Sequence, residues 1–97
     1  MSHQEALKKF REIQKKHIAD MKAKPIGTRV LVRFTEMAGE FGTLKKHGRK
    51  YAVVELDNGE MWKIPYWDIT DKVEDPKALQ EAEINRRLSR FFNGLFN

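Results

Sequence analysis

The stretch Tyr51–Thr70, YAVVELDNGEMWKIPYWDIT, decides the fold of this 97-residue chain. Its first six residues alternate with the period of two that is typical of a strand with one buried face, Ala52, Val54 and Leu56 against Tyr51, Val53 and Glu55. The Asn58-Gly59 pair that follows favours a hairpin, because both residues tolerate a positive φ. We therefore expect a return strand over residues 60–64, with Trp62 and Ile64 on the core face.

Pro65 ends that return strand, since proline has no N–H to donate to a sheet. The segment Tyr66–Asp68 is too short for an α-helix, and we expect one 3₁₀ turn there. A last strand is predicted near Ile69–Val73.

Two further strands are predicted before the hairpin. Residues 28–35 alternate between a core face with Val30, Val32 and Phe34 and an outer face with Arg29, Leu31 and Arg33. A second strand begins at Phe41–Leu44, where Gly42 suits a bulge or a tight corner. Residues 45–50 then form a basic turn. Five short strands without an intervening helix predict a small antiparallel barrel over residues 26–73.

An amphipathic helix is predicted on each side of this barrel, at residues 1–24 and 75–97. The first begins with a capping box at Ser2 and Glu5, and the second begins at Asp75-Pro76. The apolar stripe of the first helix is expected to pack on another element, or else its basic face lies along phosphates. For the apolar end of the second helix, packing on the barrel or on the first helix is expected; the alternative is docking to another protein or to a second copy, through Leu88, Phe91, Phe92, Leu95 and Phe96.

Composition narrows the classes of function. There is no cysteine, which excludes disulfides and cysteine-based zinc sites, and the three histidines lie in separate elements. We therefore expect no enzymatic activity, no cofactor and no metal site. No apolar run approaches the roughly 18 residues of a membrane span, and without a targeting pattern a cytoplasmic location is expected. The net charge of +5 permits a polyanionic partner.

The basic and aromatic residues suggest two kinds of binding site. Cations that contact phosphates, with aromatic rings that stack on bases, are typical of nucleic-acid binding. The candidates for contacts to DNA or RNA are Arg29, Arg33, Lys45, Lys46, His47, Arg49, Lys50, Tyr51 and Lys63. The alternative is a protein-interaction module, in which an aromatic pocket of Phe41, Tyr66 and Trp67 binds a cationic side chain.

The segment 27–70 resembles the small SH3-like barrels of the KOW and Tudor type. The matching residues are Gly27, Val30 and Val32 in the first strand, Gly42 and Leu44 in the second, and the alternating strand before Asp57-Asn58-Gly59. It is especially similar to the barrel appended to some SprT-like proteins. Their protease activity depends on a zinc-binding HExxH helix, which this chain lacks. The resemblance implies a five-stranded barrel that binds nucleic acid or protein. With the two predicted helices, the expected fold class is α+β, mostly β.

Overall fold

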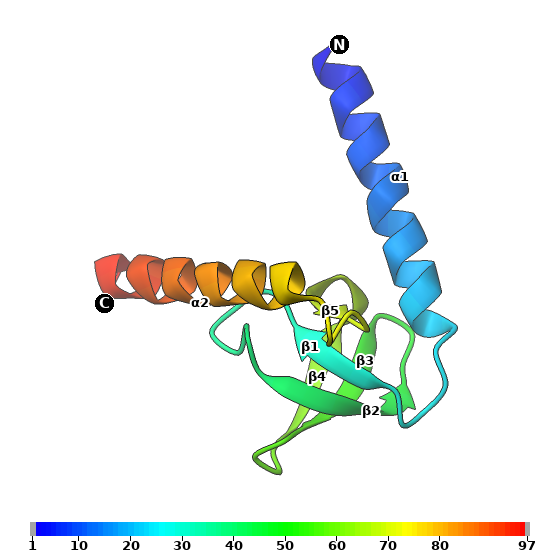
Figure 1. Cartoon of the computed structure of the whole chain (residues 1–97). Helices are drawn as coiled ribbons and strands as arrows, with labels where there is room; N and C mark the ends of the chain where they lie inside the picture. Colours follow the sequence, from blue (N-terminus) through cyan, green and yellow to red (C-terminus); the bar gives the residue numbers. More distant parts are fainter. Residues whose placement is uncertain (1, 97) are drawn as a thin grey trace.

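The chain folds into a five-stranded antiparallel sheet with one helix at each end (Figure 1). The computed structural model describes residues 2–96, apart from the side chain of Phe96. In chain order, the elements are α1 (His3–Lys22), β1 (Arg29–Val32), β2 (Phe41–His47), β3 (Tyr51–Leu56), β4 (Met61–Pro65), a 3₁₀ turn (Tyr66–Asp68), β5 (Ile69–Thr70) and α2 (Pro76–Phe96). The predicted α+β class, with two helices flanking five strands, is confirmed.

The sheet is open, and the closed barrel that the sequence predicted is not formed. The strand order is β4-β3-β2-β1-β5, and every neighbouring pair is antiparallel. Within residues 2–96, the edge strands β4 and β5 do not pair with each other. Pro65 ends β4 without an N–H donor, and β5 has only two residues, because the strand predicted to reach Val73 stops at Thr70. The edge at β5 is therefore too short to close the sheet against β4.

Both faces of the sheet are covered near β1. One face carries the main core, which consists of Met21 of α1 together with Val30, Val32, Leu44, Ala52, Val54, Leu56, Ile64, Tyr66 and Ile69. Leu31, which alternates with Val30 and Val32, points to the other face and packs with Ala38 and with Ala82 of α2. The sheet is thus anchored to a different helix on each side.

The turn between β3 and β4 departs from the expected geometry. Gly59 has a φ of +90°, but Asn58 does not adopt a positive φ. The Gly59 N–H donates to the carbonyl of Leu56 at 2.8 Å, and the Leu56 N–H donates to the carbonyl of Glu60 at 2.8 Å. This is the three-residue hairpin loop in which a glycine in the left-handed region completes a type I turn.

Two residues predicted to face the core lie elsewhere. Trp62 pairs with Val54 across the hairpin, yet 42% of it is exposed and its indole N–H donates to Glu60 at 2.8 Å. It lies opposite the buried Val54, but on the edge strand β4, and its ring stays partly exposed. Phe34 lies after the end of β1 and is half-buried, with its ring stacked on Trp67 at 6.2 Å.

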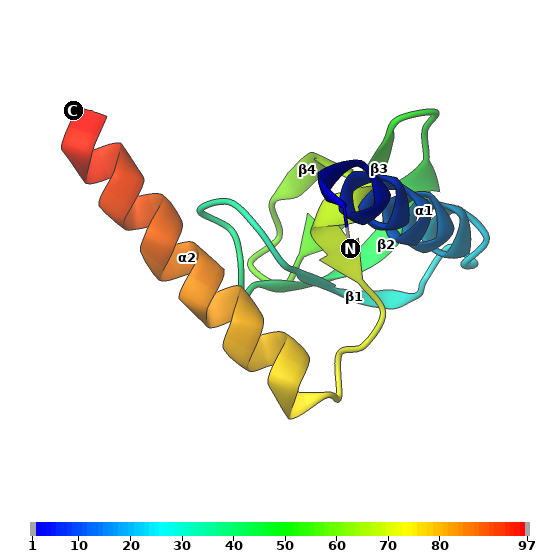
Figure 2. The same cartoon turned by 90° about the horizontal axis from the view of Figure 1, so that it is seen from above.

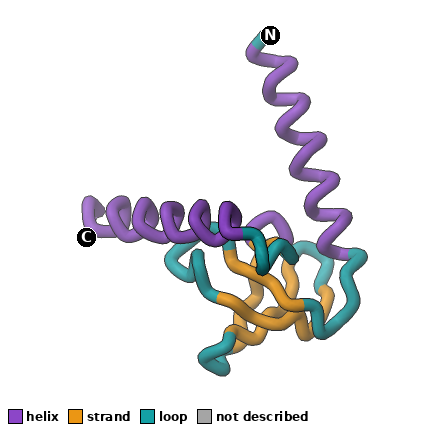
Figure 3. The backbone as a smooth tube through the Cα atoms, in the orientation of Figure 1, coloured by secondary structure: helices purple, strands orange, loops and turns teal. Residues whose placement is uncertain are grey.

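The helices leave the sheet in different directions (Figures 1 and 2). In α1, Met21 is the buried residue and it lies in the last turn, next to the sheet. The buried residue of α2, Ala82, lies in the second turn. The tube in Figure 3 shows that the far half of each helix extends beyond the strands. The buried residue of each helix therefore lies near the end that joins the sheet.

Candidate functional site

Five of the nine residues predicted to contact nucleic acid lie together in one groove on the outer face of the sheet. We call it the β2–β3 groove; it holds about 360 Å³ and is lined by Lys46, Gly48, Arg49, Lys50, Tyr51, Val53 and Lys63. Lys46, Val53 and Lys63 are register partners across β2, β3 and β4, so they form a row on one face. Half of Tyr51 is exposed at the edge of this row. The groove thus combines four cations with an accessible aromatic ring.

A β-bulge creates this arrangement. The register of β2 on β3 shifts between Leu44 and Lys46, so that one extra residue, Lys45, is inserted. Consequently Lys45 and Lys46 are both exposed, although they are consecutive in a strand. After the shift, His47 pairs with the buried Ala52 and its side chain turns toward the interior.

His47 belongs to the support of the groove and does not line it. Its Nε2 lies 2.6 Å from the carbonyl of Lys24, and its Nδ1 lies 3.1 Å from the hydroxyl of Tyr66. The same hydroxyl donates to the carbonyl of Gly48 at 2.7 Å. The predicted basic turn 45–50 is thus wrong for residues 45–47, which continue β2, and the turn begins at Gly48. Its first residue is tied to a buried tyrosine, which fixes where Arg49 and Lys50 leave the sheet.

Three other predicted cations lie away from the groove. Arg29 donates to both carboxylate oxygens of Asp57, at 2.6 and 2.8 Å, which lowers the pKa of Asp57. Lys45 pairs with Glu55 at 3.4 Å. Arg33 is half-buried near the other end of β1. In contrast, Lys46, Arg49, Lys50 and Lys63 form no ion pair with any residue in the described range 2–96.

The three residues of the predicted aromatic pocket lie in three different environments. Tyr66 is only 1% exposed and belongs to the main core. Phe41 packs with the second cluster, next to α2. Trp67 is half-buried under α1, where Phe10 and His17 contact it edge-on at 5.8 and 5.3 Å between ring centroids. The structure does not bring these rings together around one cation.

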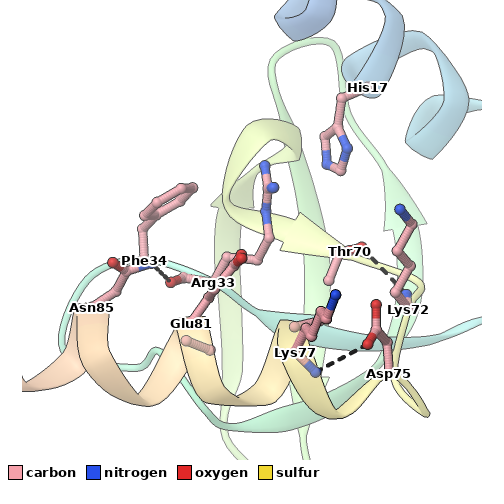
Figure 4. Close-up of a pocket in the computed structure, with 11 residues that line it drawn as sticks. His17, Arg33, Phe34, Thr70, Lys72, Asp75, Lys77, Glu81 and Asn85 are labelled. Carbon is pink, nitrogen blue, oxygen red and sulfur yellow. Dashed lines mark hydrogen bonds between the residues drawn. The ribbon is translucent and has the colours of Figure 1, made fainter.

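A cleft that the sequence did not predict lies between the two helices (Figure 4). This interhelical cleft holds about 500 Å³ and is lined by His17, Arg33, Phe34, Thr70, Lys72, Asp75, Lys77, Ala78, Glu81, Ala82 and Asn85. Arg33 lies over the rings of Trp67 at 4.4 Å and Phe34 at 5.0 Å, and it donates to the carbonyl of Trp67. Residues 33 and 67 are 34 positions apart, so no local pattern could have predicted this stacking.

Burial lowers the pKa of two basic groups that line this cleft. Desolvation lowers the pKa of His17, and the positive charge of Arg33 lowers it further. The hydrogen bond between His17 and the carbonyl of Ile69, at 2.6 Å, raises this pKa and so opposes part of the shift. Desolvation also lowers the pKa of Arg33, whose Nε is buried without a hydrogen-bond partner in the described residues. The acidic side chains Asp75 and Glu81 face the same space, so the cleft has mixed charge.

Two features are absent from the described residues. No three histidine, aspartate or glutamate side chains within residues 2–96 lie close enough together to hold a metal ion. Neither described helix is both long and apolar enough to cross a membrane.

The apolar end of α2 does not pack within the chain, contrary to the expectation from sequence. The exposed fractions are 50% for Leu88, 62% for Phe91, 53% for Phe92 and 62% for Leu95. The side chain of Phe96, the fifth predicted contact, lies outside the described part. The expected packing on the sheet or on α1 is wrong for these four side chains.

Comparisons with protein-family models, with curated proteins and with solved structures found no match to this chain.

Proposed function

We propose that this protein binds DNA or RNA through the β2–β3 groove and that it acts by binding, without catalysis. The observation that carries the proposal is the convergence of Lys46, Arg49, Lys50 and Lys63, free of ion pairs with other described residues, around the exposed ring of Tyr51. Free cations contact phosphates and release counterions. An exposed aromatic ring adds stacking on an unpaired base.

The strand order supports an open form of the small SH3-like barrel that the sequence resembles. β4 and β5 are joined by a single 3₁₀ turn, and β5 returns to pair with β1. The β2–β3 groove lies on the outer face away from β1, and no residue of either helix lines it.

The test is binding of labelled single-stranded and double-stranded DNA and RNA over a series of salt concentrations. If all four cations contact phosphates, log K should fall with log[salt] with a slope of about −3.6 on duplex DNA and about −2.8 on single strands. The variant K46A/R49A/K50A/K63A should lose this binding. Lys45 is left in place because it pairs with Glu55.

A matched control comes from α1. The variant K8A/K9A/R11A/K15A removes the same four charges from exposed positions of that helix, and it should keep most of the affinity and the salt slope. If the α1 variant loses binding and the groove variant keeps it, the site is the basic helix. If neither variant changes the affinity, the proposal of a phosphate-binding groove is wrong.

A second candidate function is protein interaction through the helices. It is favoured by the exposed apolar side chains in the far half of α2, because contiguous apolar surface of this kind marks interaction sites. A partner bound there would leave the β2–β3 groove free, so this function is compatible with the first.

A further inference from the structure

α2 has two different faces. The side that faces the sheet and the loop before β2 carries small or polar residues: Ala82 is buried, Asn85 donates to the carbonyl of Arg33 at 2.8 Å, and Asn93 donates to Glu36. The opposite side, about half a turn around the helix, carries large apolar residues that are about half exposed or more, namely Ile84, Leu88, Phe91 and Leu95. The contacts of α2 with its own sheet therefore leave this outer side uncovered.

The spacing of these four residues is four, three and four positions. This is the pattern of alternating d and a positions in a coiled coil, where an apolar residue recurs on average every 3.5 residues. We call Ile84, Leu88, Phe91 and Leu95 the outer seam. A seam of this spacing is suited to another helix, because the side chains of each helix fit between those of its partner.

We propose that the partner is α2 of a second copy of this chain, paired in parallel through the outer seam. This inference rests on the protein-interaction function and specifies its partner. In this pattern Ile84 and Phe91 are d residues, and Leu88 and Leu95 are a residues. In a parallel pair, the residue just before an a residue lies beside the partner residue just after the following d residue. Arg87 thereby lies beside Phe92 of the partner, a favourable cation–π pair.

The flanking residues discriminate between orientations. In an antiparallel pair, the positions before the a residues of both helices share one side of the seam. When residue 95 lies opposite residue 84, the nearest such position to Arg87 is Gly94 of the other copy, which has no ring. In the parallel pair, the other flanking positions are Gln80 and Asn85, which carry no charge. The parallel arrangement is therefore the one that gives Arg87 an aromatic partner.

The available area is sufficient for a weak, reversible dimer. The outer seam and Phe92 are 48–62% exposed, and large apolar side chains of this kind bury up to about 200 Å² each. Two copies together can bury roughly 1,000 Å², which is close to the lower limit for a specific interface. We expect a dissociation constant in the micromolar range.

The first test is sedimentation equilibrium of the full chain over a range of concentrations, at low and at high salt. We expect a monomer–dimer equilibrium that does not weaken as salt rises, because apolar contacts are not screened. The variant L88E/F91E should dimerise at least about 100-fold more weakly, since the dimer would bury unpaired carboxylates. The matched control L7E/I13E adds the same charge at exposed apolar positions of α1 and should dimerise as the wild type does.

The second test determines the orientation. Because the chain has no cysteine, the variant L95C should form a disulfide-linked dimer under mild oxidation if the helices are parallel. In an antiparallel pair, residue 95 lies opposite residue 84, so cross-links would form only when L95C is mixed with I84C. That second outcome would overturn the parallel arrangement.

A chain that stays monomeric up to about 1 mM, or an L88E/F91E variant that dimerises like the wild type while keeping its helix content, would overturn self-pairing. Dimerisation through the outer seam does not depend on the cations of the β2–β3 groove. The variant K46A/R49A/K50A/K63A should still dimerise, and L88E/F91E should keep the salt slope of nucleic-acid binding per chain. Each proposal can thus fail without the other.

Discussion

The sheet and the helices use their large apolar side chains in opposite ways. In the sheet, Leu44, Val54 and Ile69 are fully buried. In the helices, Ile13, Phe91 and Leu95 are each more than half exposed. Both regions show clear apolar periodicity in the sequence. The comparison teaches that periodicity predicts the type of element, whereas the element that covers an apolar face depends on long-range packing.

The largest expected effect comes from replacing a leucine of the sheet by alanine, compared with the same replacement in α2. Leu44→Ala opens a cavity in the main core and should lower the free energy of unfolding by about 2–5 kcal/mol. Leu88→Ala, half exposed on α2, should change it by less than about 0.5 kcal/mol. Urea denaturation at low protein concentration measures both. Equal losses for the two variants would mean that the outer side of α2 is buried within the monomer.

A matched pair of glycines gives a smaller effect with opposite signs. A Cβ on Gly42 would lie 2.7 Å from the carbonyl oxygen of Glu55 and 2.7 Å from Cγ1 of Val54, so Gly42→Ala should destabilise the sheet by about 1–3 kcal/mol. A Cβ on Gly94, within α2, meets no atom within 4 Å. Gly94→Ala should therefore stabilise the helix, by at most about 1 kcal/mol. Thermal unfolding followed separately for sheet and helix would show both shifts, and destabilisation by Gly94→Ala would contradict the open position of that residue.

The smallest effect concerns His17, where α1 meets the sheet. Its pKa in the folded state is below the ordinary value of 6.5, so the unfolded chain binds the proton more tightly. The stability contributed by neutral His17 is fully present above pH 6.5 and is lost as pH falls through the lowered pKa. Besides Arg33, the carboxylate of Asp71 faces this ring and opposes the shift.

His17→Gln keeps an N–H donor for the carbonyl of Ile69 but cannot titrate. The difference in unfolding free energy between wild type and variant, measured by denaturant at pH about 7.5 and about 5.5, isolates the contribution of His17 from that of the other two histidines. We expect the wild type to lose more stability than the variant at the lower pH. An equal loss in both proteins would show that the ring is not desolvated.

Much of the fold followed from local signals. The alternation in residues 51–56 and the Asp57-Asn58-Gly59 turn predicted the central hairpin, and the capping residues Ser2 and Asp75 predicted where the helices begin. Ser2 accepts a hydrogen bond from the Glu5 N–H at 3.2 Å, as the capping box required. These features depend on a few neighbouring residues, so the sequence alone determines them.

The candidate site was only partly predictable. Lys46, Arg49 and Lys50 were identified because they cluster in the sequence, but the bulge at Lys45 decides which way each side chain points, and two consecutive lysines carry no signal of a bulge. The exposure of Trp62 could not be predicted either, because alternation identifies the face of a residue and not whether its strand lies at the edge of the sheet. The stacking of Arg33 on Trp67 depends on contacts between distant segments.

The anchoring of α1 at one end has a consequence for how the protein melts. Met21, Ile18 and His17 hold its last turns, whereas before them only Phe10 packs its ring on Trp67. Isolated helices shorter than about 12–15 residues are marginal in water. Amide hydrogens should therefore exchange with a gradient along α1, slowly near Met21 and rapidly near His3. Helix and sheet would then not lose structure in a single cooperative transition, and a single melting temperature would describe the sheet alone.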